Sequence, residues 1–189
     1  MLLFAVFGVL MSAAVGLPSP RPGDGPSSAI RNYEDNIMRA QFDFKPFSLT
    51  DLSIDCTKDA PEEPKFECAM EFGWENPNAN KSGSCHYSWE WDGVTKEHGD
   101  ENGYNVEYYR CIWKGPEFFQ FYFESMVDYS NFSLRMSHKF KDAHHFDPPE
   151  FANMFAEGNF TLHQTENTTT SIIYAAPGPF DAPFKGMTI

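Results

Sequence analysis

Apolar side chains occupy every second position in two segments of the chain. Between residues 65 and 74 the even positions are apolar, while the odd positions include Lys65, Glu67 and Glu71, and residues 132–140 alternate in the same way. A period of two places successive side chains on opposite faces of a β-strand. Both segments are therefore predicted to be strands with one face in the core.

Other parts of the chain show weaker strand patterns, rich in aromatic and β-branched residues. They are residues 42–56, 85–91, 104–113, 119–124, 158–164 and 170–175. Pro46 and a change of parity near Asp51 predict a break or bulge in the first of these segments. In total we expect seven or eight strands in an all-β, antiparallel β-sandwich or β-barrel.

One short helix is expected after residue 146. Asp147 suits the N-cap position, Pro148 suits the first helical position, and Glu150 completes a capping box. The apolar residues that follow are spaced as on one face of a helix, and Gly158 would end it. We expect this helix to cover one end or one face of the sheet.

Composition divides the chain into four parts. Residues 1–16 form an uncharged apolar run that ends in small residues, as in a cleavable signal peptide, with an uncleaved membrane anchor as the alternative. Residues 17–40 are rich in Pro, Gly and Ser, which predicts a flexible leader. The β-domain is expected in residues 41–176, and residues 177–189 are expected to be a Pro-rich tail on its surface. The protein is thus predicted to be secreted and extracellular.

Four cysteines follow the predicted signal peptide, at Cys56, Cys68, Cys85 and Cys111. An even number of cysteines in a secreted chain predicts disulfides. Of three pairings we favour Cys56 with Cys68 and Cys85 with Cys111, because each pair would join segments expected to be neighbouring strands. A zinc site is disfavoured, because these spacings lack the close Cys-x-x-Cys pairs of thiolate sites.

Four Asn-x-Ser/Thr sequons predict a glycoprotein made by a eukaryotic secretory route. Their acceptors are Asn80, Asn131, Asn159 and Asn167. The formal net charge of −13 disfavours nucleic acid and anionic lipid as partners, since both are bound through Lys and Arg.

The candidate metal ligands are His138, Asp142, His144 and His145, which combine imidazole and carboxylate groups. His138 lies on the apolar side of its predicted strand and the two later histidines fall in a predicted loop, so we expect no metal and no cofactor. The sequence also lacks G-x-S-x-G, H-E-x-x-H and a phosphate-binding glycine loop. We expect no catalytic residue, although paired carboxylates leave a secreted acid hydrolase as one alternative.

The tryptophans bear on a binding role. Trp74, Trp89 and Trp91 lie on the apolar side of their predicted strands, which favours core packing, and Trp113 is less clearly assigned. An exposed row of tryptophans would instead suit sugars or a protein partner.

Residues 107–140 are similar to the Alternaria-type major-allergen family of fungal secreted β-barrel proteins. The family arrangement is an aromatic-x-Cys strand, a Phe-x-Phe strand and an alternating strand. In this chain those places are filled by Tyr109 and Cys111, by Phe119, Phe121 and Phe123, and by Leu134 and Met136. The resemblance does not extend to residues 56–85, and no spare cysteine remains for an intermolecular bridge.

The resemblance implies a noncatalytic fungal protein that acts at the host interface, as an allergen or effector, and carries over no active-site residues. Our leading hypothesis is therefore a secreted effector-like or allergen-like protein that binds a host or cell-surface protein or a glycan. A carbohydrate- or small-ligand-binding module is the first alternative, and the acid hydrolase is the second.

Overall fold

The computed structural model describes residues 44–146 and 148–189. The predicted signal peptide and leader, and the predicted N-cap Asp147, lie outside these residues. Within the described chain there are eleven strands and no helix, arranged in two antiparallel sheets. The all-β prediction is confirmed, whereas the prediction of seven or eight strands is wrong.

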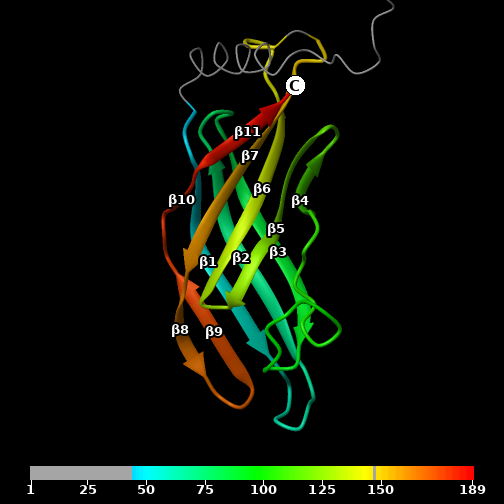
Figure 1. The fold of residues 1–189 in the computed structure, drawn as a ribbon, viewed down its shortest axis with the longest axis vertical. Coiled ribbons are helices and arrows are strands. Elements are labelled where there is room, and N and C mark those ends of the chain that lie inside the picture. Colours follow the sequence, from blue (N-terminus) through cyan, green and yellow to red (C-terminus); the bar gives the residue numbers. More distant parts are fainter. Residues whose placement is uncertain (1–43, 147) are drawn as a thin grey trace, which may run out of the picture. The chain divides into compact units, whose positions relative to one another are not determined.

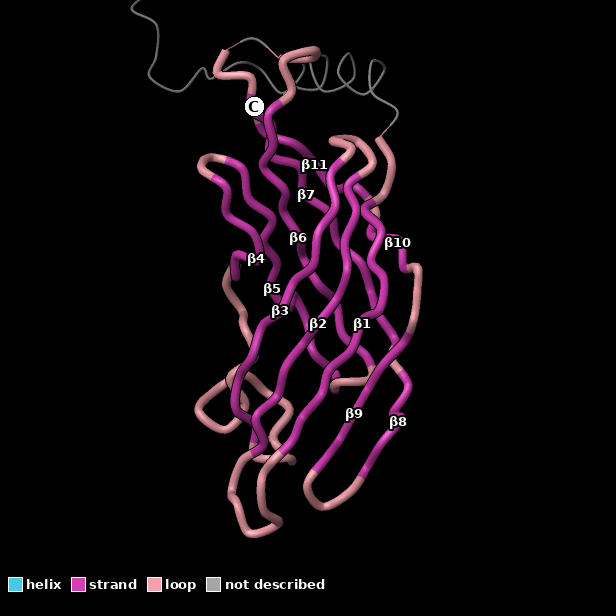
Figure 2. The backbone as a smooth tube through the Cα atoms, turned by 180° about the vertical axis from the view of Figure 1, so that it is seen from behind, coloured by secondary structure: helices cyan, strands magenta, loops and turns pink. Residues whose placement is uncertain are grey.

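The two sheets lie face to face, as the opposite views of Figures 1 and 2 show. Sheet A has the order β3 (Lys81–Trp91), β2 (Phe66–Asn76), β1 (Phe47–Thr57), β9 (Ser171–Ala176) and β8 (His163–Asn167), with β10 (Phe180–Ala182) also paired to β1. Sheet B has the order β11 (Phe184–Thr188), β7 (Phe151–Thr161), β6 (Asn131–Lys141), β5 (Glu117–Asp128) and β4 (Tyr109–Lys114).

Strand β1 contains the predicted irregularity. Its register with β2 shifts between Thr50 and Ser53, and Asp51 has a φ of 53°. The bulge divides β1 into two parts, of which the first pairs with β10 and the second with β9. The Asp51 backbone N–H donates to the Pro177 carbonyl at 2.9 Å, which holds the turn between β9 and β10 against the bulge.

The Pro-rich segment after residue 176 is part of both sheets and is not a surface tail. Strand β10 pairs with β1 of sheet A, and β11 pairs with β7 of sheet B. The prolines of this segment do not prevent strand formation. Pro177, Pro179 and Pro183 lie between strands, where a missing N–H removes no ladder hydrogen bond.

The predicted helix is wrong, because residues 151–161 form the long strand β7. Even-numbered residues of this segment are buried, among them Ala152, Met154, Ala156 and Phe160. Each residue of β7 is paired with one of β6, so the local helix signals are overridden by eleven cross-strand pairs. The apolar residues of this segment fit both a helical period and a period of two. In this fold only the period of two buries one continuous face of the segment.

The core between the sheets is built from aromatic rings. Trp74 stacks on Phe119 with ring centroids 4.2 Å apart, and Phe72 meets Phe121 edge to face at 5.2 Å. Trp74, Trp89 and Trp91 are 5%, 7% and 8% exposed, so their predicted core positions are confirmed. The side chain of Trp113 lies outside the described part of the structure.

Both disulfides have the favoured pairing. Cys56 and Cys68 are register partners on β1 and β2, so this bond joins neighbouring strands as expected. The bond between Cys85 and Cys111 differs, because it connects edge strand β3 of sheet A to edge strand β4 of sheet B. Cys111 lies at a bulge in β4, where the register shifts between Arg110 and Ile112.

Candidate functional site

A pocket at one end of the sandwich, the end pocket, lies where two connections between strands meet the β8–β9 hairpin. The loop after β3, the β5–β6 turn and the β8–β9 hairpin enclose about 360 Å³. This volume lies at the lower end of the range for small-molecule sites. The lining residues are Trp91, Gly93, Val94, Thr95, Lys96, Asn102, Met126, Asp128, Tyr129, Ser130, Gln164 and Tyr174.

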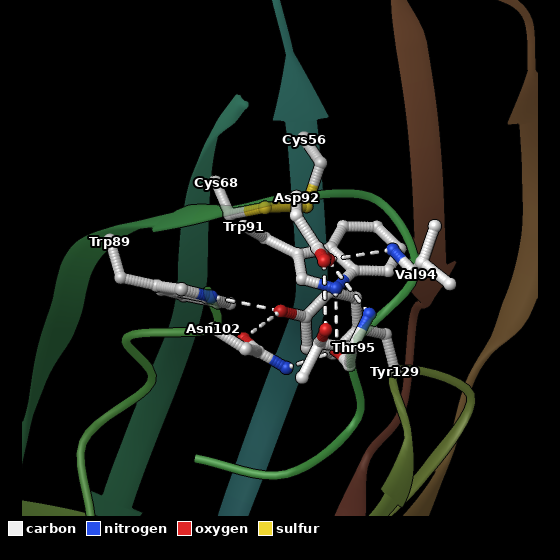
Figure 3. The surroundings of a disulfide bond; sticks show 9 residues. All are labelled: Cys56, Cys68, Trp89, Trp91, Asp92, Val94, Thr95, Asn102 and Tyr129. Carbon is white, nitrogen blue, oxygen red and sulfur yellow. Dashed lines mark hydrogen bonds between the residues drawn. A yellow bond between two sulfur atoms is a disulfide. The ribbon is translucent and has the colours of Figure 1, made fainter. Parts of the chain in front are cut away.

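A continuous hydrogen-bond network holds the inner wall of the end pocket (Figure 3). The Trp89 indole N–H donates to the Tyr129 hydroxyl at 2.9 Å, and this hydroxyl donates to Asn102 Oδ1 at 2.6 Å. Asn102 Nδ2 then donates to the Thr95 carbonyl at 2.8 Å, which also accepts from the Trp91 indole at 2.7 Å. Hydrogen bonds within the protein therefore hold the aromatic inner wall of the end pocket to the loop after β3.

Tyr129 is a neutral phenol at the centre of this network. Desolvation by burial raises the pKa of Tyr129 well above its ordinary value, although hydrogen bonds with Trp89 and Asn102 act in the opposite direction. The hydroxyl accepts one hydrogen bond and donates another, so it is not a free nucleophile or base. Its role in the described structure is to position the wall.

The loop after β3 is shaped by Asp92. Its carboxylate accepts from the backbone N–H groups of Val94 and Thr95 at 2.8 and 2.7 Å, and from the Thr95 hydroxyl at 2.7 Å. These hydrogen bonds, that of the Thr95 N–H foremost, lower the pKa of Asp92. The loop therefore keeps its form, with Gly93 at a φ of 88° where a side chain would be strained.

The end pocket combines rings with a balanced polar rim. Tyr129 meets Trp91 and Tyr174 edge to face, with centroids 4.6 and 6.2 Å away. Lys96 and Asp128 form an ion pair at 3.9 Å on the rim. One positive and one negative charge cancel, so the rim favours no charged ligand.

A second and smaller pocket, the His138 pocket, lies at the opposite end of β3. It encloses about 130 Å³ and is lined by Trp74, Lys81, Ser82, Glu117, Phe118, Phe119 and His138. Burial, and then the positive charge of Lys81, lower the pKa of His138 to about 4, so the ring is neutral at pH 7. The histidine is in the core, as its strand parity predicted.

Of the four candidate metal ligands, the structure brings the side chains of Asp142 and His145 into contact, whereas His144 contacts Asp142 through its backbone N–H. His145 Nδ1 lies 2.6 Å from Asp142 Oδ2, and the His144 backbone N–H donates to Asp142 Oδ1 at 3.0 Å. His138 is instead engaged by Asn76, with Nδ1 3.0 Å from the Asn76 amide nitrogen. In residues 44–146 and 148–189 no three His, Cys, Asp or Glu side chains are arranged to hold a metal ion.

Carboxylates come together on the outer face of sheet A. His86 Nδ1 lies 2.9 Å from Glu71 Oε1. Burial, followed by the negative charge of Glu71, raises the pKa of Asp55. Asp55 and Glu71 belong to the lining of neither pocket described above.

All four sequon acceptors are exposed. Asn80 lies in the turn between β2 and β3, whereas Asn131, Asn159 and Asn167 lie on β6, β7 and β8. Ser133 of β6 pairs with Asn159, and Asn131 pairs with Thr161, which places two acceptors on the outer face of sheet B.

The fold and pockets define a class: a disulfide-bonded, sandwich-like all-β protein with an aromatic pocket at one end. Comparisons with protein-family models, with curated proteins and with solved structures find no match. Disulfides persist in oxidising compartments, so the two cystines favour such an environment. No helix in the described residues is long and apolar enough to cross a membrane.

Most residues that line the end pocket could not be predicted from the sequence. Asn102, Tyr129 and Tyr174 lie in segments far apart in the chain, and only the fold brings them together. Trp91 was correctly predicted to be buried, but its sequence position did not indicate that it also lines a pocket. An Asp-Gly pair directly after a strand, at Asp92, was the local signal for a structured loop.

Proposed function

We propose that this protein is a secreted, noncatalytic binding protein whose end pocket takes a small uncharged molecule that contains a ring. The observation that carries the proposal is the preformed aromatic wall of Trp91, Tyr129 and Tyr174 beside the amide of Asn102. Rings provide broad apolar contact and orient a ligand ring, while a few amide and hydroxyl groups provide specificity. This is the small-ligand alternative of the sequence analysis.

The charge pattern supports an uncharged ligand. The whole chain has a formal net charge of −13, which disfavours small anions at long range. The ion pair of Lys96 and Asp128 leaves the rim without a net charge to attract a cation. Val94, which lines the pocket, is 79% exposed, and such an apolar side chain favours contact with an apolar ring face.

The wider setting of the proposal is a fungal, effector-like or allergen-like glycoprotein that acts outside the cell. It is supported by the apolar segment 1–16, by four sequons with exposed acceptors, by two disulfides, and by the resemblance of residues 107–140. A host or cell-surface molecule would then supply the ligand, as a free compound or as part of a glycan.

The proposal is tested by titrating the purified protein with two small sets of probes, neutral pyranoses and neutral phenols. Tryptophan fluorescence is the readout, because Trp91 lines the pocket. We expect saturable binding of at least one set. Tyr174→Ala should raise the Kd at least tenfold, a loss of about 1.4 kcal/mol, because it removes one ring of the wall.

Tyr108→Ala is the matched control. Tyr108 is also a partly exposed tyrosine, but it packs on Tyr122 of sheet B and does not line the end pocket. Its substitution should leave the Kd within twofold of the unsubstituted protein. Failure of both probe sets to bind, or equal losses in the two variants, would refute the proposal.

A further inference from the structure

The polar side chains of the end pocket differ in whether the protein already uses their hydrogen-bonding groups. On the inner wall, Asn102 Nδ2 donates to the carbonyl oxygens of Thr95 and Lys96 at 2.8 and 3.3 Å. Asn102 Oδ1 accepts from the Tyr129 hydroxyl, which itself accepts from the Trp89 indole. The N–H and O–H groups of these side chains are therefore engaged within the protein, where they hold the wall.

The polar side chains of the rim are also paired with groups of the protein. The Thr95 hydroxyl donates to Asp92 Oδ2 at 2.7 Å, and the Ser130 hydroxyl donates to Asp128 Oδ1 at 2.6 Å. The second carboxylate oxygen of Asp128 lies 3.9 Å from Lys96 Nζ. A ligand that used these groups would first have to break the contacts that shape the rim.

The β8–β9 hairpin, at one edge of sheet A (Figure 2), supplies two lining side chains whose polar groups are nearly unused. Gln164 and Tyr174 are register partners on the two strands. Gln164 Nε2 lies 3.5 Å from the Tyr174 hydroxyl oxygen, which is too long for a strong hydrogen bond. Within the described part of the chain, neither side chain has another hydrogen-bond partner. The pair therefore offers amide N–H groups, an amide oxygen and a phenol O–H to a ligand in the pocket.

We propose that Gln164 and Tyr174 determine which ligand the end pocket binds, and that this ligand is a neutral pyranose held through two adjacent hydroxyl groups. A hydroxyl group both donates and accepts, so one sugar hydroxyl binds the amide while its neighbour binds the phenol. A ligand with a single hydroxyl would leave one of the two side chains unused. The inference rests on the proposed function, because it names the ligand class of the same pocket.

The rings of the end pocket suit the rest of a pyranose. Trp91 and Tyr129 line the same pocket as the polar pair, and their rings offer apolar surface to the C–H groups of a sugar. The ligand then has its polar groups toward the β8–β9 hairpin and an apolar side toward the inner wall. This division matches the distribution of free and engaged polar groups in the lining.

The test is a titration of the purified protein at pH 7 with the methyl glycosides of glucose, galactose and mannose, and separately with phenol. The readout is the ¹⁵N-resolved NH₂ signal of the Gln164 side chain, assigned with Gln164→Met. We expect a saturable shift of this signal with at least one glycoside. The Kd of that glycoside should be about tenfold lower than the Kd of phenol, which has one hydroxyl.

The free sugars distinguish two sources of the ligand, since a glycan has a blocked anomeric hydroxyl and a free monosaccharide does not. A glycoside that binds at least as tightly as its free sugar would assign the pocket to the end of a glycan. Tighter binding of the free sugar would assign it to a monosaccharide.

Gln164→Met and Tyr174→Phe each remove one polar group and keep the length or the ring of the side chain. Each should raise the Kd of the glycoside about fivefold, as for the loss of one hydrogen bond. Thr165→Val is the matched control, because Thr165 is exposed on the same strand and does not line the pocket. It should change the Kd by less than about twofold, as expected for a substitution that removes no contact with the ligand.

Two results would overturn this inference and leave the end pocket a binding site. One is glycoside binding that Gln164→Met does not weaken, and the other is a Kd for phenol below that of every glycoside. If neither the glycosides nor phenol bind, the proposed function fails as well.

Discussion

At the scale of single residues, His138 shows how position decides chemistry. Among the candidate metal ligands it had the most informative sequence context, because its strand parity placed it inside. In the structure it is 4% exposed, packs 5.1 Å from Trp74, and is hydrogen-bonded by Asn76. A protonated ring would place an N–H against the Asn76 amide, so the fold favours the neutral form.

The lowered pKa of His138 predicts a pH-dependent stability. Between pH 6.5 and about 4 the unfolded chain binds a proton at this position and the native protein does not, so stability falls as the pH falls through this range. The loss should amount to about 3 kcal/mol. Denaturant unfolding at pH 4 to 7 measures it, as the difference between the unsubstituted protein and His138→Gln.

His163→Gln is the control for this measurement. His163 is exposed on edge strand β8, so its substitution removes an imidazole without disturbing the core. We expect the pH dependence of unfolding to remain with His163→Gln and to become shallower with His138→Gln. Equal slopes in the two variants would contradict the role assigned to burial.

At the scale of the elements, β7 shows how pairing overrides local preference. The sequence around Pro148 has the features of a helix start, yet the chain after it pairs with β6 along its whole length. Gly158 then belongs to the strand interior and does not end a helix. A Cβ at this position would lie 2.8 Å from Cζ of Phe160 and 3.3 Å from the Ala182 Cα.

Gly158→Ala is expected to destabilise the protein by about 1–3 kcal/mol, the usual cost of overpacking a filled core. The Phe160 ring is fully buried, so in a close-packed core it moves aside only if its neighbours also shift. Guanidinium unfolding gives the change in free energy. Gly186→Ala on β11, where an added Cβ meets nothing within 4 Å, should change stability by less than about 0.5 kcal/mol. A similar loss in both would show that packing at residue 158 is not the cause.

At the scale of the whole molecule, the two disulfides constrain different parts of the fold: one lies within sheet A and the other connects the two sheets. Cys56 and Cys68 join strands that the β1–β2 ladder already aligns. Cys85 and Cys111 join the two sheets at their β3 and β4 edges. Both cysteine pairs were predicted correctly from the sequence. The expected reason was that each pair joins neighbouring strands, and this holds for Cys56 and Cys68 but not for Cys85 and Cys111, which lie on different sheets.

Replacing both cysteines of a disulfide by alanine should therefore have unequal effects. Loop-closure entropy predicts a loss of about 3 kcal/mol for the Cys56–Cys68 bond, with a separation of 12 residues, and about 3.5 kcal/mol for the Cys85–Cys111 bond, with a separation of 26. Only the second variant should also speed hydrogen exchange in β4. Faster exchange in β4 of the Cys56→Ala, Cys68→Ala variant would contradict this division of tasks.

The sequence by itself determined the all-β class, the core tryptophans, the bulge near Asp51 and the favoured cysteine pairing. These follow from a period of two and from local residue chemistry, which act within one strand or turn. Tertiary structure alone decided the strand nature of residues 151–161, the sheet positions of residues 180–188 and the lining of both pockets. Each of these depends on which distant segment lies alongside, because pairing and burial between strands outweigh local propensity.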